Sequence, residues 1–459
     1  MRLLKVAFHT LGCKLNQLET ESVADAFSAA GARIIPFDEE ADLYVVNTCT
    51  VTSKAEQKAR RVMRQAIVQN PQAVVLVTGC YAQMDPEGLS LVHPRAVVIP
   101  GDEKSALLAL ATWLQDNWQG HGDLHEAVVE WKTGLHANTE PGSPATLDRF
   151  AYHPRSFAFH SRPSLKIEDG CDNRCAYCRV CLARGPAVSL PADLVLERVL
   201  ELEEAGKAEV VLTGINLALY CDSALRFPGL LARLIEGTKS IRFRISSWEP
   251  EFTDQAFLSV FAHPRVQPHV HLSVQSGSDP VLRRMARPYT AGRVAEAVAA
   301  LRATRDDPFL AADIIAGFPG ETDAEFEETF AFCRDMDFAW IHAFPFSARP
   351  GTKAFDMRPK VPERLAGERV ARLGALASAG KAAYVQRWIG KTLPLILEKG
   401  DEGQDMGTTA NYLKATVLGI PAALALAALT PGAILSVTLT SPAEAPGADV
   451  QAVLAAFEG

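Results

Sequence analysis

The sequence predicts an α/β protein with three parts: an N-terminal open parallel sheet, a central three-quarter (βα)6 barrel and a C-terminal small β-barrel. Strands and helices alternate over the first hundred or so residues, and a second strand–helix series follows residue 162. The last seventy or so residues contain short strands without intervening helices. Alternating strands and helices are typical of parallel sheets. A chain of 459 residues also fits several domains better than one.

The first part is predicted to fold as a domain over residues 1–120. Apolar segments at 6–9, 42–46 and 74–77 are predicted strands, and residues 16–30, 53–69 and 106–118 are predicted helices. Residues 119–162 break this rhythm and contain Pro141-Gly142-Ser143-Pro144, so residues 121–162 are predicted to be a linker.

The second series is predicted to fill residues 163–385. Its predicted strands are 164–167, 209–212, 241–245, 270–274, 310–315 and 339–344, with helices such as 194–205 and 293–302 between them. Six such units are too few for a closed eight-unit barrel, so an open barrel is expected. Predicted strands at 393–397, 411–417 and 433–439 form the β module of residues 386–459.

Composition limits the class of protein. Apolar residues make up 48% of the chain and charged residues 22%, which is typical of globular domains. The longest apolar stretch, residues 420–429, is too short to span a bilayer, and residues 1–5 show no signal peptide. We therefore expect a cytoplasmic protein without a membrane partner. Nine cysteines, an odd number, favour metal binding or catalysis over a disulfide framework.

The net charge of −8 does not favour nucleic-acid binding, so any RNA contact needs a local basic patch. The predicted helix 53–69 offers one. Its basic residues are Lys54, Lys58, Arg60, Arg61 and Arg64. A solvated helix face is the alternative interpretation, and the sequence leaves both open.

Three cysteines follow the first strand of the second series in a C-x3-C-x2-C pattern: Cys171, Cys175 and Cys178. Three thiolates can hold three irons of a [4Fe-4S] cluster and leave the fourth iron open to a ligand. A structural zinc site usually takes four ligands, which makes zinc the weaker interpretation. Cys181 follows two residues later, and we expect it to be a structural cysteine rather than a fourth ligand.

Three further cysteines each follow a predicted strand of the first part: Cys13, Cys49 and Cys80. Because the carboxyl ends of parallel strands meet at one edge of a sheet, these cysteines could share a metal site. Three independent buried cysteines remain the alternative on this evidence alone. Cys221 and Cys333 show no such placement and are interpreted as structural.

Glycine and polar residues recur where later strands of the second series end, which favours a ligand site there. The candidates are Thr213, Gly214, Asn216, Ser246, Glu249, Gln275 and Gly317. Each one alone is an ordinary βα turn residue.

These motifs resemble a known family, the radical S-adenosylmethionine (SAM) methylthiotransferases. TLGCKLNQ at residues 10–17, VNTCTVT at 46–52 and TGCYAQ at 78–83 are similar to its N-terminal domain. The cysteine loop of residues 166–178, the ARG of 183–185 and HLSVQSGSD at 271–279 are similar to its radical SAM core. The C-terminal module lies where the family carries a TRAM β-barrel.

The resemblance implies two [4Fe-4S] clusters, one on each cysteine triplet, and SAM bound at the open iron and the strand-end residues. One SAM methylates a sulfur, and a second gives the radical that removes hydrogen from carbon 2 of an adenine. KLNQ and TVT are similar to the MtaB type, which acts on threonylcarbamoyladenosine at position 37 of tRNA. Implied partners are a tRNA anticodon loop, an electron donor such as flavodoxin or ferredoxin, and a sulfur source.

Three alternatives remain beside this assignment: methylthiolation of isopentenyladenosine in tRNA, methylthiolation of ribosomal protein S12, and a non-enzymatic electron carrier. Carriers need fully ligated clusters, which two three-cysteine sites do not provide. The chain also departs from the family pattern in two places. Arg179-Val180-Cys181-Leu182 replaces two apolar residues followed by Pro and Tyr. From Gln386 onward four Lys or Arg face seven Asp or Glu, a composition that does not favour RNA binding.

Overall fold

The computed structural model describes residues 3–137, 149–398, 405–419, 432–443 and 447–455. The chain forms two compact units, each described here by itself. The first contains residues 1–159, 165–190 and 347–355, and the second contains residues 160–164, 191–346 and 356–459. Among the described helices, none is both long and apolar enough to cross a membrane. The apolar stretch 420–429 and the segment 141–144 lie outside the described residues.

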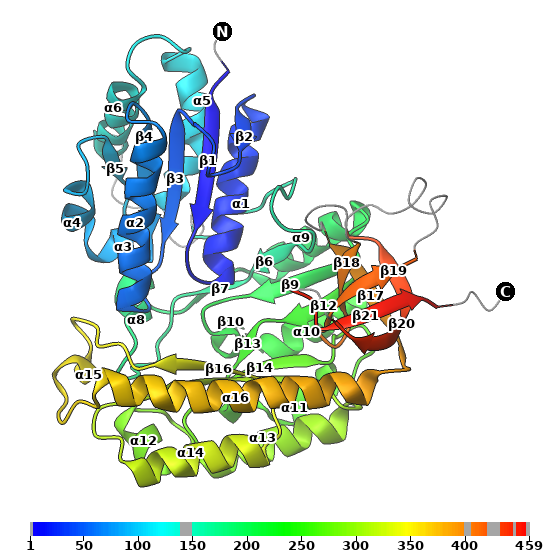
Figure 1. Cartoon of the computed structure of the whole chain (residues 1–459). Coiled ribbons are helices and arrows are strands. Elements are labelled where there is room, and N and C mark those ends of the chain that lie inside the picture. The colour runs from blue at the N-terminus through cyan, green and yellow to red at the C-terminus, as the bar shows by residue number, and fades with distance from the viewer. Residues whose placement is uncertain (1–2, 138–148, 399–404, 420–431, 444–446, 456–459) are drawn as a thin grey trace. The chain divides into compact units, whose positions relative to one another are not determined.

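A five-stranded parallel sheet forms the centre of the first unit, with strand order β2-β1-β3-β4-β5 (Figure 1). The strands are β1 (Lys5–Thr10), β2 (Arg33–Ile35), β3 (Leu43–Thr48), β4 (Val74–Gly79) and β5 (Ala96–Val98). Every residue of β3 and β4 is buried, as expected for central strands covered on both faces. The helices are α1 (Lys14–Ala29), α2 (Ser53–Gln69), α3 (Cys80–Met84), α4 (Pro86–Ser90), α5 (Leu107–Asn117) and α6 (Leu124–Ala137).

Helices cover both faces of this sheet. Phe27 of α1 and Leu110 of α5 pack in one buried cluster with apolar strand residues, and Met63 of α2 and Leu89 of α4 pack in another. The predicted bounds of α2 are correct, and Thr52 caps this helix by accepting a hydrogen bond from the Ala55 N–H. The sequence therefore predicts the sheet, although not its short edge strands β2 and β5.

Helix α6 lies inside the segment predicted to be a linker. The prediction of an irregular segment from residue 121 is wrong for residues 124–137, because Leu124, Val128 and Trp131 are buried against the core formed by α1 and α5. The linker is predicted from a break in the strand–helix rhythm and from the Pro141–Pro144 run, and an amphipathic helix before that run is compatible with both. The domain boundaries stay predictions.

Residues 165–190 also belong to the first unit. This segment contains β7 (Glu168–Asp169), α8 (Val180–Arg184) and β8 (Val188–Ser189), and β7 pairs with β8 in antiparallel. The cysteine loop of residues 171–178 lies between β7 and α8, so it is held within the same compact unit as Cys13, Cys49 and Cys80.

The second unit contains the predicted strand–helix series. Its main strands are β9 (Glu209–Thr213), β12 (Arg242–Ile245), β13 (Ser247–Trp248), β14 (His269–Gln275), β15 (Phe309–Ala316) and β16 (Trp340–Pro345). Strands β9 and β12 pair in parallel, and β13 to β16 form a four-stranded parallel sheet. The start of β6 (Ser164–Lys166) lies beside β9, where Val211 N–H donates a hydrogen bond to Pro163 O. The six predicted strands are thus confirmed, and the arrangement is open rather than a closed eight-unit barrel.

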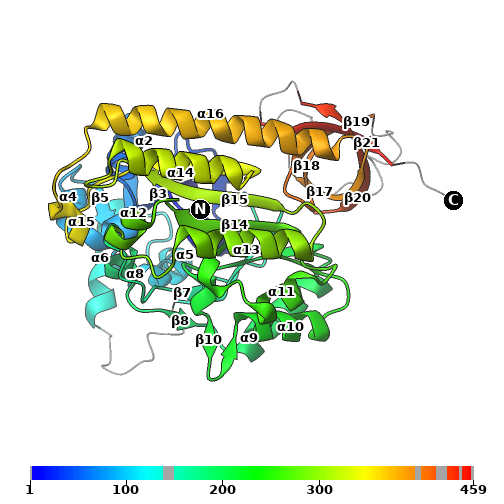
Figure 2. The same cartoon turned by 90° about the horizontal axis from the view of Figure 1, so that it is seen from below.

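Helices alternate with these strands and cover them. They are α9 (Ala192–Glu204), α10 (Phe227–Gly237), α11 (Gln255–Phe261), α12 (Asp279–Arg284), α13 (Ala291–Thr304), α14 (Asp323–Asp335) and α16 (Glu363–Trp388). The short helix α15 (Lys353–Asp356) lies at the end of segment 347–355, which belongs to the first unit. A small hairpin, β10 (Cys221–Asp222) with β11 (Leu225–Arg226), follows β9. Figure 2 shows α16 running beside α14 and β15 toward the C-terminal strands.

The C-terminal part of this unit is a closed five-stranded barrel with strand order β17-β18-β19-β21-β20. Its strands are β17 (Thr392–Glu398), β18 (Met406–Thr409), β19 (Lys414–Leu418), β20 (Ile434–Pro442) and β21 (Val450–Leu454). The predicted strand 411–417 starts later, at Lys414, because Tyr412 occupies a turn with a φ of 67°. The barrel core is continuous with Tyr384 and Trp388 of α16. The predicted fold class is therefore confirmed.

Candidate functional site

Cys13, Cys49 and Cys80 all lie at the carboxyl edge of the first unit's sheet. Strand register aligns Thr10 with Asn47 and Asn47 with Thr78, so the loops that follow β1, β3 and β4 start side by side. The three thiols are close enough to influence one another, because burial together with the neighbouring Cys80 and Cys13 raises the pKa of Cys49 to about 12. The structure thus brings together the three cysteines that the sequence places after separate strands.

Amide and hydroxyl side chains hold these loops against each other. Asn16 donates hydrogen bonds to the carbonyls of Leu11 (2.8 Å) and Thr48 (3.1 Å), and Asn47 donates to the carbonyl of Asn16 (3.0 Å). Gly79 has a φ of 97°, and a Cβ at this position would lie 2.4 Å from the Thr48 carbonyl. The turn before Cys80 therefore requires glycine.

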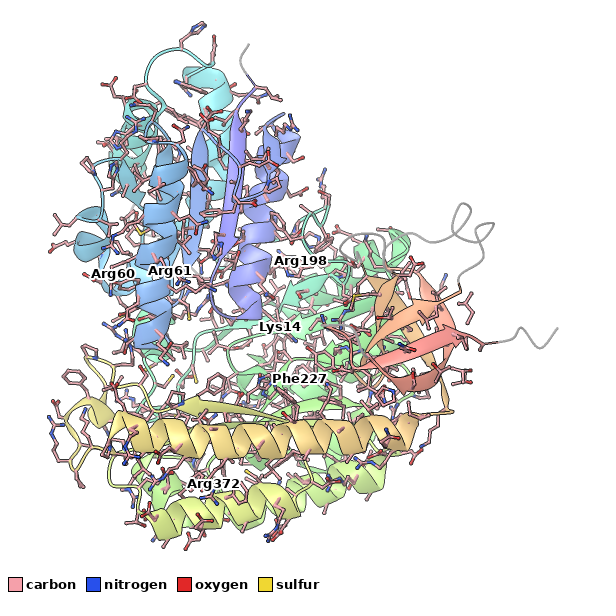
Figure 3. The ribbon with its side chains drawn as sticks, viewed as in Figure 1. Lys14, Arg60, Arg61, Arg198, Phe227 and Arg372 are labelled. Carbon is pink, nitrogen blue, oxygen red and sulfur yellow. The ribbon has the colours of Figure 1, made fainter. Side chains whose placement is uncertain are left out.

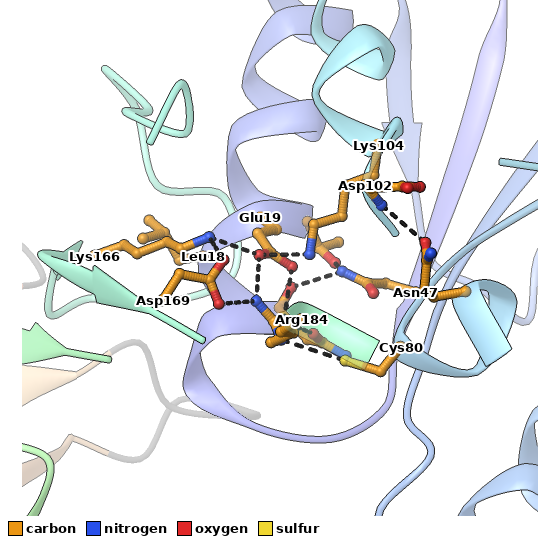
Figure 4. A network of polar contacts seen from close by, with 12 residues as sticks. Leu18, Glu19, Asn47, Cys80, Asp102, Lys104, Lys166, Asp169 and Arg184 are labelled. Atoms are coloured by element: carbon orange, nitrogen blue, oxygen red, sulfur yellow. Dashed lines mark hydrogen bonds and ion pairs between the residues drawn. The ribbon is translucent and has the colours of Figure 1, made fainter. Parts of the chain in front are cut away.

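A buried network of five charged side chains lies behind Cys80 (Figure 4). Glu19 is its centre and accepts ion pairs from Lys104 (2.7 Å), Arg184 (3.1 Å) and Lys166 (3.3 Å). Asp169 pairs with Lys166 (2.5 Å) and Arg184 (2.9 Å). These cations lower the pKa of Glu19 to about 2 and of Asp169 well below its usual range, despite burial that acts in the opposite direction.

The network contains three cations and two carboxylates, so it carries one surplus positive charge. Arg184 brings this charge to the cysteine site, because its Nε donates a hydrogen bond to the Sγ of Cys80 (3.3 Å). A cavity of about 230 Å³ lies at the same place and is lined by Cys80, Lys104, Lys166 and Arg184 among others. This environment favours an anion such as a thiolate.

Cys171, Cys175 and Cys178 lie on the loop before α8. The loop is closed by a hydrogen bond from Cys171 N–H to Gly185 O (3.1 Å). Burial together with the neighbouring Cys175 and Cys171 raises the pKa of Cys178 to about 12. Cys181 lies in α8, and its thiol also raises the pKa of Cys178. The structure therefore brings the triplet together and places Cys181 nearby.

The chemistry of these two donor sets fits iron-sulfur clusters. No three acidic, histidine or cysteine side chains within the described ranges are already arranged around a metal position. Each set nevertheless offers three thiols, and thiolates are the ligands that [4Fe-4S] clusters use. Three ligands also leave one iron available for another ligand.

The strand-end candidates lie in the second unit. Thr213 and Ser246 directly follow paired residues of β9 and β12, and the Oγ1 of Thr213 and the Oγ of Ser246 are buried without a hydrogen-bond partner among the described residues. Such hydroxyls fit polar groups of a bound ligand. Glu249 is buried, and burial raises its pKa to about 7 although Arg287 pairs with it.

The remaining candidates have internal contacts. The side chain of Asn216 accepts a hydrogen bond from Ala218 N–H, and Gln275 ends β14 with a φ of 66°. Gly317 has its N–H bonded to Glu321 (2.6 Å), and a Cβ there would lie 2.5 Å from the Cβ of Ala366, so α16 packs closely on it. Gly214 follows β9 directly.

The basic side of α2 is largely exposed. Lys54, Lys58, Arg61 and Arg64 are exposed, whereas Arg60 bonds to the Tyr81 hydroxyl and lies 5.6 Å from the centre of that ring. Figure 3 labels Arg60 and Arg61 on this helix. Four of the five predicted basic residues thus form one exposed face, and Arg60 supports the chain around Tyr81 instead.

Sequence reasoning missed the charged network. Lys166 and Asp169 are three positions apart, but Glu19, Lys104 and Arg184 are distant from them and from one another in sequence. One sequence signal could have pointed to the network: a charged residue inside a motif of otherwise small or apolar residues, such as Arg184 between Ala183 and Gly185.

Known proteins share both halves of this architecture. The radical SAM superfamily matches residues 165–333, and the uncharacterized protein family UPF0004 matches residues 5–101. The chain is similar to the threonylcarbamoyladenosine tRNA methylthiotransferase MtaB of Treponema pallidum (strain Nichols), with 42% identity over 91% of this chain and 95% of that protein. The MtaB of Bacillus subtilis (strain 168) is 36% identical over 90% of each chain.

A relative from another branch is more distant. The tRNA-2-methylthio-N(6)-dimethylallyladenosine synthase of Cereibacter sphaeroides (strain ATCC 17025 / ATH 2.4.3) is 30% identical over 95% of this chain and 96% of its own length. The resemblance seen in the sequence motifs is thus confirmed over nearly the whole chain. The chain belongs to the radical SAM methylthiotransferase family and is an enzyme that uses [4Fe-4S] clusters and SAM.

Proposed function

We propose that this protein methylthiolates carbon 2 of N6-threonylcarbamoyladenosine at position 37 of tRNA, in the cytoplasm. The observation that carries the proposal is the 42% identity, over 91% of the chain, to a protein named for this reaction. The KLNQ and TVT motifs that follow Cys13 and Cys49 agree with the same branch.

Each cysteine triplet would hold one cluster. Cys171, Cys175 and Cys178 would hold the cluster whose open iron binds SAM, and Cys13, Cys49 and Cys80 would hold the second. When bound, the clusters and SAM supply the radical, the sulfur site and the methyl group. The buried hydroxyls of Thr213 and Ser246 would form hydrogen bonds with polar groups of SAM. The other strand-end candidates, Gly214, Asn216, Glu249, Gln275 and Gly317, would line the same cofactor site.

The protein's own groups position these sites. Asn16 and Asn47 fix the loops that carry Cys13, Cys49 and Cys80, and Arg184 fixes the orientation of Cys80 through its Nε–H. Burial of the charged network keeps water away from this side of the sheet. Two further partners belong to the proposal: an electron donor such as flavodoxin or ferredoxin, and an external source of sulfur.

The test offers the reconstituted enzyme three substrates: tRNA bearing threonylcarbamoyladenosine, tRNA bearing isopentenyladenosine, and ribosomal protein S12. Mass spectrometry of the digested products should find the methylthio group on threonylcarbamoyladenosine. The more distant dimethylallyladenosine relatives motivate the second substrate. Modification of isopentenyladenosine or S12, with none of threonylcarbamoyladenosine, would overturn the proposal.

A further inference from the structure

Two arginines of the first unit, the buried Arg349 and the partly buried Arg179, share a single carboxylate. Arg179 follows Cys178 directly, Arg349 lies in the segment 347–355, and both bond to Glu56 in the first turn of α2. Arg179 Nη1 lies 3.2 Å from Glu56 Oε1, and Arg349 Nη2 bonds to the same oxygen. The side chains of Arg179 and Arg349 are only 10% and 3% exposed.

The charges in this cluster do not balance. Two guanidinium groups face one carboxylate, so one positive charge lacks a partner, and buried cations are normally paired. The Nε of each arginine is buried and donates no hydrogen bond to any described residue.

The other charged group near Arg179 is already engaged. The carboxylate of Asp85, which also acts on Arg179, caps α4 by accepting a hydrogen bond from Gly88 N–H (3.1 Å), and it accepts another from the Tyr81 hydroxyl (3.2 Å). The surplus positive charge on the two arginines is therefore available to an anion from outside the chain.

The cluster also connects the two cysteine loops. Arg179 Nη1 and Arg349 Nη2 lie 3.3 Å and 3.4 Å from the hydroxyl of Thr50, the residue after Cys49. Arg179 itself is the residue after Cys178. A substrate that must reach both cysteine sites would therefore place the substituents next to its reacting atom close to these two arginines.

We propose that Arg179 and Arg349 form the subsite that binds the carboxylate of the threonylcarbamoyl group. This inference rests on the proposed function. The threonine of that group is attached through its nitrogen and keeps a free carboxylate, which a guanidinium can bind through two charge-assisted hydrogen bonds. The isopentenyl group is uncharged and would leave the buried positive charge unpaired, so the subsite would also select against it. A backbone phosphate of the same tRNA is also an anion and could occupy the subsite instead. The experiment below distinguishes the phosphate from the threonyl carboxylate.

The experiment compares three forms of one tRNA at position 37: threonylcarbamoyladenosine, its neutral methyl ester, and unmodified adenosine. Wild-type enzyme should show a KM roughly 10- to 100-fold lower for the acid than for the ester, the range expected for hydrogen bonds to a charged group. Arg179→Met should lose most of this preference, and Arg179→Lys should restore part of it. Arg33→Met, at an exposed position of β2, is the matched control and should keep the full preference.

The tRNA with unmodified adenosine identifies the anion. Its Kd should be similar for wild type and Arg179→Met; an equal loss of affinity for all three tRNAs would assign the subsite to a phosphate and overturn the proposal. The ester comparison in the wild-type enzyme needs no variant, so it decides the question even if Arg179→Met fails to bind its cluster. Equal KM values for acid and ester in wild type would refute the subsite. A wild type that leaves threonylcarbamoyladenosine unmodified and modifies isopentenyladenosine would instead refute the proposed function.

Discussion

Removing the carboxylate of Glu19 should destabilise the first unit strongly. Glu19 is 2% exposed and holds Lys104, Lys166 and Arg184 within 2.7–3.3 Å. Glu19→Gln would leave three buried cations with Asp169 as their only carboxylate. Breaking a buried ion pair by removing one partner costs about 3–5 kcal/mol, because the other charge stays buried.

The pKa of Glu19 leads to a similar magnitude. Its fall from 4.5 to about 2 on folding corresponds to about 3 kcal/mol at neutral pH. Because the folded pKa is the lower one, this stabilisation is fully present above pH 4.5 and is lost as the pH falls toward 2. For a unit of this size, a loss of that order lowers the midpoint of thermal unfolding by roughly 10 °C.

The assay is thermal unfolding of cluster-free protein followed by circular dichroism at pH 7 and at pH 3. Glu19→Gln should unfold well below wild type at pH 7, and the difference should shrink at pH 3. Glu130→Gln, at an exposed position of α6, is the matched control and should change the midpoint by a degree or two at most. A Glu19→Gln midpoint within two degrees of wild type at pH 7 would refute the assigned role of the network.

Four further outcomes follow from the cysteine loops and from α2. Replacing Cys171, Cys175 and Cys178 with Ala should lower the iron content of the reconstituted protein from about eight to about four atoms per chain. The same variant should no longer cleave SAM to 5′-deoxyadenosine, and retained cleavage would contradict the ligand assignment. Replacing Cys13, Cys49 and Cys80 with Ala should also remove about four irons, whereas an iron count equal to wild type would make these cysteines structural. Cys181→Ser should keep the visible cluster spectrum and SAM cleavage, and loss of the cluster would identify Cys181 as a ligand. Lys58→Glu with Arg61→Glu should weaken tRNA binding and reduce its salt dependence with iron content equal to wild type, whereas unaltered binding would make this an ordinary solvated face.

The strands and their following cysteines were predictable because each depends on a local pattern. Val74–Gly79 is a continuous apolar run followed by a glycine turn, and the parallel arrangement then fixes where Cys80 must lie. The edge strands β2 and β5 were not predictable, since each has three residues and little apolar periodicity of its own. Helix α6 was missed although Leu124, Val128 and Trp131 recur at helical spacing, because the Pro- and Gly-containing residues that follow it led to the whole segment being interpreted as a linker.

The interactions around the cysteines depend instead on residues that are distant in sequence. Glu19 and Arg184 are separated by 165 positions, and Glu56 and Arg349 by 293. Nothing in the spacing of such residues predicts their contact, because a long-range ion pair is set by the packing of several elements at once. The sequence therefore predicts the cluster ligands, whereas the charged residues around them become visible only in the structure.

These long-range contacts explain how one compact unit can contain both cysteine sets. The segment 165–190 carries Cys171, Cys175 and Cys178, and Arg184 at its α8 bonds to Glu19, Asn16 and Cys80 of the N-terminal sheet domain. Arg179 in the same segment bonds to Glu56 and Thr50. Arg179 and Arg184 thus attach the cysteine loop of residues 171–178 to the loops that follow β3 and β4. Each arginine belongs to a group of charged side chains with a surplus of positive charge. Clusters and substrate carboxylates are anionic, so binding them would neutralise that charge and strengthen the attachment of the loop. Cluster-loaded enzyme should consequently resist proteolysis within residues 165–190 better than cluster-free enzyme, and equal cleavage rates in the two forms would show that the attachment does not depend on the clusters.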